Sequence, residues 1–547
     1  MAIQTGPAES PTQISTNIDN IQGNILGGFS QNHQAFLFVQ IPDAESGKDW
    51  VQDVVDDRAT STEVLQQKEE FRRRQAAASP GQTDADILGD ATATFVNLAF
   101  TWGGLQALGV SDDDLATFPD DFRQGMRARA SIIGAVDDSA PENWIPPFHE
   151  DPDSQVHAIL IVAADLADDR DAKVAELIEQ LDDHGIVLLS RQDGDVREDD
   201  PGHEHFGFDD GVSQPGVRDD RVTPPDSNDP NLGLPGQDRL WPGEFVLGYP
   251  RQADGEDGPD RGAVDTPGPV VHSGPEWTDD GSYLVYFRLR QDVKGFRTFL
   301  TDQAASLQIS EDVMGAKLVG RYKSGCPLEV THFEAGSFDT THGDPSEKDP
   351  KDPSLLTPEK INDFDYHDDE TGTNPDRKGA NDDDGHRVPR AAHIRKVYPR
   401  NELPVPGEAE AERRRILRRG IAFGQSFDPY APDEDFDPLN PGDNPTGANG
   451  DRGLQFVSYQ TSLADKFEFL LRAWVNNSQF PQSGDGQDLI ISFTAQRDAN
   501  GNEFRPFRLP LPDGTHDIAA PHRWVFITGG EYFFQPSISA LRQLSGD

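Results

Sequence analysis

Residues 207–215 read GFDDGVSQP and contain a Gly-x-x-Asp-Gly motif that holds the carboxylate of Asp210 among turn-forming residues. Glycine permits tight backbone turns, so Gly211 can help to fix that carboxylate in one position. A carboxylate held in this way can accept a proton and return it, which is general acid–base chemistry. Because Asp-Gly pairs are also ordinary turns, the motif predicts a catalytic site only together with other reactive residues.

A histidine far downstream, His393, lies in the segment AAHIRK at residues 391–396. A neutral imidazole nitrogen can bind iron while a carboxylate or carbonyl group holds the other ring N–H. Most histidines of a chain are surface or structural residues, so the segment alone makes His393 only a candidate metal ligand. The sequence names no hydrogen-bonding partner for it. The small residues Ala391 and Ala392 leave space beside it for a flat group.

Three other histidines compete for a metal-binding role. His386 is the nearest in sequence to His393, but it lies in a polar run. His203 and His205 form a His-x-His pair just before the Gly-x-x-Asp-Gly motif. Two ligands alone make a weak metal site, so we expect both to be surface residues.

Arg418 and Arg419 supply a guanidinium within ILRRG at residues 416–420. If this segment is extended, Arg418 shares a face with Ile416 and Arg419 points the other way, so only one of them can face a site. A guanidinium there would stabilise negative charge that develops during a reaction. The alternative is a solvated pair that closes the basic cluster at residues 413–415.

With these segments in view, the chain resembles the dye-decolorizing (DyP-type) heme peroxidase family over nearly its full length. Further landmarks follow the family order, at residues 21–26, 97–100, 104–109, 243–249, 280–286, 320–325, 361–366, 453–456 and 530–536. The resemblance implies an α+β fold of two ferredoxin-like domains, with antiparallel sheets, peripheral helices and a heme cavity mainly in the C-terminal domain. We place the N-terminal domain, with the Gly-x-x-Asp-Gly motif, at residues 1–225. The heme-binding domain follows at 226–547, with an acidic surface insertion at about 342–384.

The resemblance also implies the chemistry. The chain would bind one heme b and reduce hydrogen peroxide while it oxidises dyes or phenolic and other small organic donors. His393 corresponds to the axial iron ligand, and Asp210 and Arg418 to the catalytic distal pair. Asp209 is the rival carboxylate, which we expect to face solvent. Gly211, Leu454 and Phe456 would contact the cofactor, although plain core packing explains the last two equally simply. Peroxide would lose a proton to Asp210 while Arg418 stabilises the charge that develops as the O–O bond breaks.

Two departures from the family pattern stand near the proposed ligands. Residues 388–390, Val-Pro-Arg, replace a Cys-Pro-aromatic run, and Gly420 stands where some subgroups have Asn. A heme-binding or deferrochelatase-like heme-handling protein is the alternative function, and peroxide turnover separates the two. A carboxylate-rich hydrolase or cation-binding protein is a third, which explains the acidity but not the ordered landmarks. Relatives can oxidise large donors at surface aromatic residues; the candidates here, most of them expected in the core, are Trp102, Trp144, Trp241, Trp277, Trp474 and Trp524.

The composition is strongly acidic, with 97 Asp and Glu against 48 Lys and Arg and a formal charge of −49. Such a charge disfavours nucleic acid and anionic membranes as partners and predicts a halophilic surface that needs salt to relieve its self-repulsion. The single Cys326 excludes an intrachain disulfide, and we expect it to pack as a small apolar residue. The first residues lack a signal-peptide pattern, so we expect a cytoplasmic protein. The family resemblance also implies that the protein can form a homodimer.

Local patterns outline the elements. Apolar runs predict strands near residues 35–41 and 158–163, and helix-like segments lie near 62–76 and 172–183. Residues 218–238 look like a connection between domains. The insertion at about 342–384 reads as a long surface loop; a calcium site is its alternative, but the spacing of an EF-hand is missing.

Overall fold

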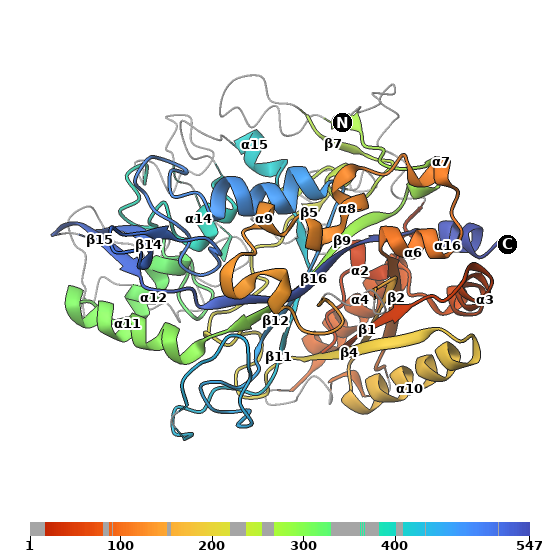
Figure 1. Ribbon diagram of the computed structural model, residues 1–547, viewed down its shortest axis with the longest axis horizontal. Coiled ribbons are helices and arrows are strands. Elements are labelled where there is room, and N and C mark those ends of the chain that lie inside the picture. The colour runs from red at the N-terminus through yellow and green to blue at the C-terminus, as the bar shows by residue number, and fades with distance from the viewer. Residues whose placement is uncertain are drawn as a thin grey trace.

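The computed structural model describes residues 17–79, 87–89, 91–149, 155–218, 237–253, 267–329, 361–362, 364, 366, 382–400, 408–432, 434–511 and 513–546. Within these residues, nine strands form one antiparallel sheet that runs through the molecule (Figure 1). Smaller sheets and helices surround it. No described helix is long and apolar enough to cross a membrane.

The first half of the sheet comes from the N-terminal part of the chain. Its strands are β1 (His33–Gln40), β2 (Thr94–Phe100), β3 (Ala158–Ala164) and β4 (Val187–Asp195), in the order β2-β3-β1-β4. All seven residues of β3 are buried, because helix α10 (Ala167–Asp183) packs on this strand. The other helices here are α2 (Gly23–Leu26), α3 (Ala44–Val54), α4 (Ser61–Ala77), α6 (Trp102–Ala107), α7 (Asp112–Leu115), α8 (Asp120–Ala128) and α9 (Ala130–Ile133).

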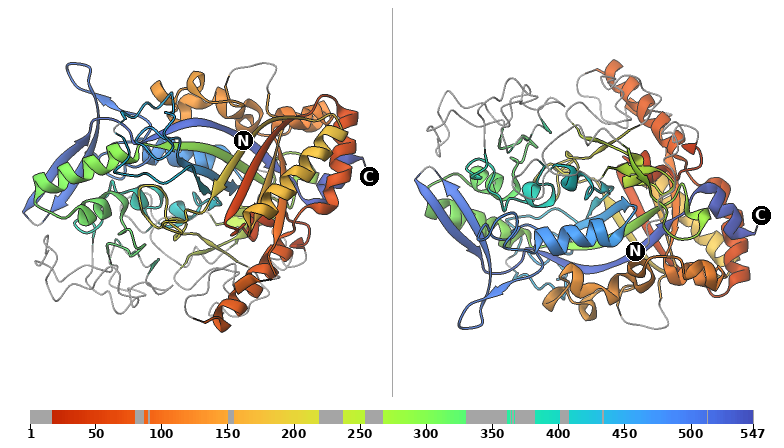
Figure 2. Two further views of the ribbon diagram at one scale, coloured as in Figure 1. Left: turned by 90° about the horizontal axis from the view of Figure 1, so that it is seen from below. Right: turned by 90° about the horizontal axis from the view of Figure 1, so that it is seen from above.

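The second half of the sheet repeats the same strand order. It contains β9 (Ser282–Gln291), β10 (Leu417–Arg418), β11 (Ile421–Phe423), β12 (Gly453–Gln460) and β16 (Val525–Gln535), in the order β10-β12-β9-β16 with β11 also on β12. With β10 and β11 counted as one interrupted strand, the first strand of each half lies between the third and the fourth, as a ferredoxin-like domain requires. The helices of this half are α11 (Val293–Leu307), α12 (Glu311–Val319), α14 (His393–Val397) and α15 (Glu408–Glu412), whereas the C-terminal α16 (Ile538–Ser545) packs on α3 of the first half. Figure 2 shows these helices from two further sides.

Short strands complete the architecture. A hairpin of β14 (Glu503–Leu511) and β15 (Gly514–Ala520), with β13 (Gln496–Arg497), projects at the end of the molecule that carries α11 and α12 (Figure 1). Two small pairs are formed by β5 (Gly216–Val217) with β6 (Arg239–Leu240), and by β7 (Pro250–Gln252) with β8 (Pro267–Val270). A π-helical stretch, Leu463–Phe467 and Leu470–Val475, follows β12.

The two halves join where β16 pairs with β2 at Phe534 and Phe100. The side chain of Gln22 reinforces this junction, since its amide donates to the carbonyl oxygens of Leu98 (2.8 Å) and Pro536 (2.7 Å). Its own side-chain oxygen accepts the Leu98 N–H at 2.9 Å. Three landmarks that are far apart in the sequence therefore meet at one buried point.

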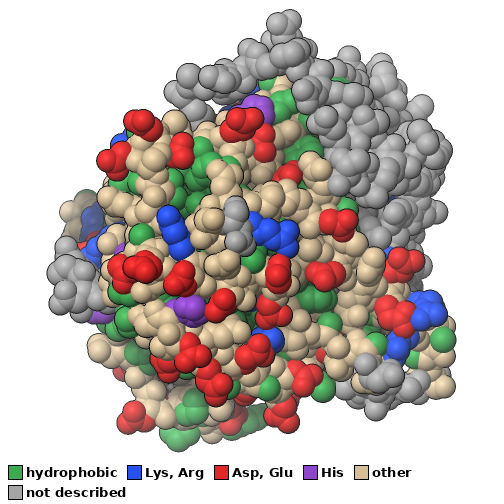
Figure 3. Space-filling model, turned by 90° about the vertical axis from the view of Figure 1, so that its right-hand side faces the viewer, with side chains coloured by type: hydrophobic (Ala, Val, Ile, Leu, Met, Phe, Trp, Pro, Cys, Tyr) green, Lys and Arg blue, Asp and Glu red, His purple; other side chains and the backbone are tan. Residues whose placement is uncertain are grey.

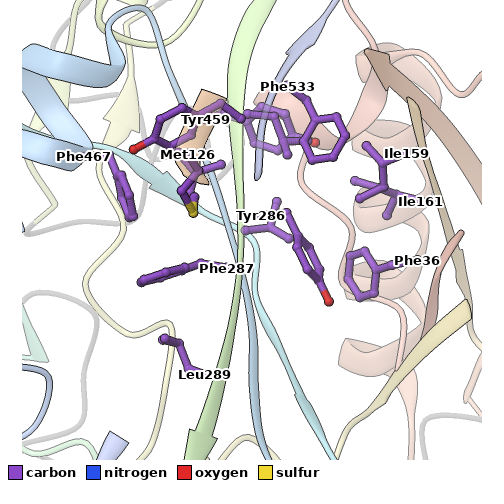
Figure 4. Close-up of a cluster of buried hydrophobic side chains, with 14 of the residues drawn as sticks. Phe36, Met126, Ile159, Ile161, Tyr286, Phe287, Leu289, Tyr459, Phe467 and Phe533 are labelled. Atoms are coloured by element: carbon purple, nitrogen blue, oxygen red, sulfur yellow. The ribbon is translucent and has the colours of Figure 1, made fainter. Parts of the chain in front are cut away.

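Strand β9 separates two apolar regions by the alternation of its side chains. Tyr286 points toward Phe36 in the N-terminal half, whereas Phe287 and Leu289 point to the opposite side, where Phe467 lies (Figure 4). Tyr286 contacts Phe36 with ring centroids 5.4 Å apart, and Phe287 meets Phe467 at 5.5 Å. The first group fills the core between the halves, and the second forms the wall of a cavity.

The strands and helices predicted from local patterns are present, with boundaries shifted by a few residues. Cys326 is buried as expected. Trp144, Trp241, Trp474 and Trp524 are also buried, and Trp102 and Trp277 are partly so. Most of the connection at 218–238 and of the insertion at 342–384 lies outside the described residues.

The prediction that the insertion is a surface loop is wrong for three of its residues. Phe364 and Tyr366 are buried, and so is Asp382, in an acidic run that reads as solvated. The Asp382 carboxylate accepts hydrogen bonds from the backbone N–H groups of residues 387 and 388 and pairs with the buried Arg395 at 3.0 Å. It therefore fixes the turn that leads into α14.

Candidate active site

The Gly-x-x-Asp-Gly motif forms one arm of a tight hairpin at residues 202–210. Asp210 donates its N–H to Gly202 O at 3.0 Å, and Glu204 donates to Phe208 O at 3.1 Å. The Glu204 carboxylate closes the turn by accepting the N–H groups of Phe206 (2.8 Å) and Phe208 (2.9 Å). Burial raises the pKa of Glu204, although these bonds and one from Gln291 oppose the rise.

Asp210 and Arg418 meet at the mouth of this hairpin. Arg418 Nη1 lies 3.2 Å from Asp210 Oδ1, and both side chains are about one-third exposed, at 31% and 34%, into a cavity that they line. Gly211 follows with a φ of 78°, which a residue with a side chain rarely adopts, and donates its N–H to Asp210 Oδ1 at 2.7 Å. The turn thus sets the direction of the carboxylate.

Gln214 holds the strand that carries Arg418. Its side-chain amide donates to Arg418 O at 3.0 Å, and its side-chain oxygen accepts the Arg418 N–H at 3.1 Å. The motif loop and β10 are therefore joined as two strands would be. Nothing in the local sequence marks Gln214 for this role.

Arg419 points away from the cavity, as strand alternation predicts. Its guanidinium donates to the carbonyl oxygens of Asn24 and Ile25, both at 3.1 Å. Gly28 makes room for it, since a Cβ on that glycine would lie 2.3 Å from Arg419 Nε. Burial lowers the pKa of Arg419 to about 10. Arg419 ties the N-terminal segment to the sheet, and Arg418 is the arginine of the pair that lines the cavity.

His393 begins helix α14 and also lines the cavity. Its Nδ1 lies 2.7 Å from Oδ2 of Asp488, whose side chain is fully buried. The other carboxylate oxygen, Oδ1, accepts the N–H groups of Ile490 (2.8 Å) and Ile491 (3.2 Å). Nδ1 is therefore committed to a fixed acceptor, which leaves Nε2 as the nitrogen that can bind a metal.

Sequence reasoning missed Asp488. Its only local signal is a carboxylate placed before the apolar run at residues 489–491.

The walls of the cavity are mainly apolar. In β12, Leu454 and Phe456 are partly exposed while Gln455 and Val457 between and beside them are buried, so the first two face the cavity. The cavity has a volume of about 250 Å³, which is far more than one water molecule needs. The other apolar lining residues include Phe287, Leu289, Val319, Phe467, Leu471, Ile491 and Phe493.

Arginines line one part of the same cavity. Among the described residues, Arg321 and Arg400 form no ion pair with a carboxylate; Arg400 donates to Tyr398 O at 3.0 Å and stacks on Phe364. Burial lowers the pKa of Arg321 to about 9, which still leaves it positively charged at neutral pH. Arg321 also donates hydrogen bonds to Gly325 O, Ile361 O and Ser213 Oγ. An apolar cavity with one available imidazole nitrogen and arginines that no described carboxylate neutralises fits a flat iron macrocycle that carries carboxylates.

Comparison with known proteins identifies the family of the chain. Residues 20–198 match the family model described as the DyP dimeric alpha+beta barrel domain, and residues 251–497 match the Dyp-type peroxidase C-terminal domain. The chain is 31% identical over 535 residues to Peroxidase 2 of Mycetinis scorodonius, covering 97% of this chain and 88% of the relative. The chain belongs to the DyP-type peroxidase family.

Solved structures of DyP-type peroxidases share the fold. An ancestral D-type dye-decolorizing peroxidase superposes with a TM-score of 0.72 at 29% identity, covering 97% of this chain and 99% of that one. A dye-decolorizing peroxidase variant from Pleurotus ostreatus gives a TM-score of 0.70 at 28% identity, with 99% and 100% covered. The DyP-type family is a family of heme-dependent oxidoreductases that act on peroxide, and the cavity residues suit that cofactor. The predicted domain boundary at residues 225 and 226 falls between the two matched regions.

Two expectations about residues beside the motif are wrong. Asp209 does not face solvent but lines the cavity, because its backbone N–H is drawn to Lys323 O at 3.1 Å. His205 is only 1% exposed, with Nε2 at 2.8 Å from Phe423 O, and burial lowers its pKa to about 4. His386 is exposed, and His203 is partly exposed. The described residues contain no cluster of three or more metal-binding side chains.

Proposed function

We propose that this DyP-type peroxidase reduces hydrogen peroxide with one heme b per chain, held by His393 and served by Asp210 and Arg418. The observation that carries the proposal is that one cavity contains both the His393–Asp488 pair and the Asp210–Arg418 pair. The first is suited to bind iron, and the second to move a proton and stabilise charge. Dyes, phenols and other small organic molecules are the proposed electron donors.

The proposed chemistry of the chain follows from the positions of these groups. When bound, heme supplies the redox chemistry, passing two electrons from successive donors to peroxide. Asp210 accepts a proton from one peroxide oxygen and returns it to the other, so that water can leave. The Arg418 guanidinium stabilises the negative charge that develops as the O–O bond breaks. Leu454 and Phe456 exclude water from the reacting atoms.

The proximal residues act through orientation. Asp488 fixes the tautomer of His393 by accepting from Nδ1, so that Nε2 carries a lone pair toward the cavity. The carboxylate cannot turn away, because its second oxygen is held by two backbone N–H groups. Arg400 and Arg321 are the proposed partners of the heme carboxylates.

The experiment is a visible absorption spectrum of the purified, heme-loaded protein before and after one equivalent of hydrogen peroxide, combined with dye oxidation. We expect a heme absorption band that changes on mixing in the wild type. Asp210→Asn should keep the heme band and lose about 10²- to 10⁴-fold in peroxide turnover. Arg419→Lys is the matched control, because Arg419 neighbours the site residue Arg418 but points away from the cavity.

A heme-handling protein is the alternative function. Heme binding with no response to peroxide would favour it over a peroxidase. Unchanged peroxide turnover in Asp210→Asn would remove Asp210 from the mechanism, and no band after heme reconstitution would contradict the proposal as a whole.

We also propose a cytoplasmic protein that works at high salt. The formal charge of −49 supports the second part, and acidic side chains visibly outnumber basic ones on the face in Figure 3. Light scattering in molar salt would test whether the protein is the homodimer that the family resemblance implies.

A further inference from the structure

A second carboxylate, Asp209, lines the same cavity directly beside Asp210. It packs against Gly325, whose φ of 80° and missing side chain make the approach possible; a Cβ there would lie 2.7 Å from Asp209 Oδ2. Among the described residues, no donor forms a hydrogen bond to the Asp209 carboxylate. A carboxyl group without donors lacks the hydrogen bonds that would favour its ionised form.

His203 lies across the hairpin from Asp209, and the two residues form a backbone bridge. Its Nε2 lies 2.9 Å from Lys323 O, and its Nδ1 lies 3.1 Å from Pro201 O and 3.2 Å from Asp200 Oδ1. Both ring nitrogens therefore face oxygens other than those of Asp209. His203 is 22% exposed and Asp200 is 43% exposed, so this side of the hairpin reaches solvent.

The charged groups around Asp209 determine when it holds a proton. Burial is the main cause that raises the pKa of Asp209 to about 6, and the carboxylates of Asp210 and Asp200 raise it further. His203 and Arg321 act in the opposite direction. Asp209 is therefore a neutral acid at mildly acidic pH and a carboxylate at neutral pH.

We propose that Asp209 stores a proton inside the cavity and resupplies it to Asp210. This inference rests on the proposed function. Each hydrogen peroxide that becomes two waters takes up two protons and two electrons, and the electrons come from the organic donors. Asp209 and Asp210 are consecutive residues that line the same cavity, so Asp209 is placed to return a proton to Asp210 there. Asp209 acts through Asp210 and is a positioning and relay residue.

The test is the pH dependence of steady-state peroxide turnover in Asp209→Asn, with the sulfonated dye ABTS as donor. Asparagine keeps the size of the side chain but cannot release a proton. We expect wild-type turnover to exceed that of the variant below pH 6 and to lose this advantage above it, because the protonated fraction of Asp209 falls about tenfold per pH unit above its pKa. His203→Gln removes a neighbour that lowers the pKa of Asp209, so the pH at which the wild type loses its advantage should rise.

A second measurement does not depend on turnover. Infrared titration of the heme-free protein should show a carboxylic acid band that disappears near pH 6 and is missing in Asp209→Asn. Asp279→Asn is the matched control: this aspartate has a raised pKa and lies 3.0 Å from His272, but it is outside the cavity lining. It should retain both the band and the pH profile of the wild type.

The outcomes separate the two proposals. If Asp210→Asn is inactive while Asp209→Asn keeps the wild-type rate and its pH dependence, the relay is refuted and the proposed function stands. If Asp210→Asn turns over peroxide normally, the proposed function fails instead. An Asp209→Asn rate reduced equally at every pH would show a structural effect and would also overturn the relay.

Discussion

Replacing Asp488 with asparagine should weaken heme binding, because Asp488 fixes the tautomer of the proposed iron ligand. The carboxylate lies 2.7 Å from His393 Nδ1, is fully buried, and accepts two backbone N–H groups with its other oxygen. In the variant, the amide oxygen can satisfy those two N–H groups only if its NH₂ group faces Nδ1. The NH₂ would then donate to Nδ1 and move the ring proton to Nε2, the nitrogen needed for iron.

The opposite amide orientation is also unfavourable, because it sets NH₂ against two backbone N–H donors. Outer-shell partners of this kind are worth about 10- to 100-fold in metal affinity, and a hydrogen bond to a charged group contributes about 1.5–3 kcal/mol. We therefore expect Asp488→Asn to raise the dissociation constant for hemin by about 10- to 100-fold.

The assay is a titration of heme-free protein with hemin in molar salt, followed by visible absorption. Asp485→Asn is the matched control: Asp485 is a buried carboxylate on the same loop that bonds Gln482 N at 2.8 Å and does not contact His393. The control should bind hemin like the wild type. Unchanged affinity in Asp488→Asn would refute the reasoning, and an equal loss in both variants would assign the effect to loop folding.

Two further predictions concern stability. Burial lowers the pKa of His205 from 6.5 to about 4. Between these pH values the unfolded chain binds more protons than the folded protein, so the free energy of unfolding falls as the pH falls, by about 3 kcal/mol in total. Urea unfolding of the heme-free protein should be measured near neutral pH and near pH 4. The free energy of unfolding should fall less between these two pH values in His205→Gln than in the wild type, and an equal fall in both proteins would contradict this account. The charge of −49 predicts that the midpoint of thermal unfolding rises with sodium chloride up to about 1 M, where the Debye length is about 3 Å; a midpoint independent of salt would argue against self-repulsion.

Local patterns were sufficient for several features. The apolar runs at β1 and β3 and the helical segments at α4 and α10 were recognisable because their side-chain periods are local. Alternation along residues 416–423 separated Arg418 from Arg419, since successive side chains of a strand point to opposite faces. The glycine that follows Asp210 marked a turn.

The partners of these residues were decided by the tertiary structure. His393 and Asp488 are 95 positions apart, and Asp210 and Arg418 are 208 apart, so no sequence period links them. Asp209 was expected in solvent, yet the packing of its hairpin against residues 323–325 turns it into the cavity. The sequence by itself determined which side chains can do chemistry and which face of a strand they occupy. Only the assembled sheet decided which of them meet, because burial and long-range hydrogen bonds depend on elements that the local chain does not contain.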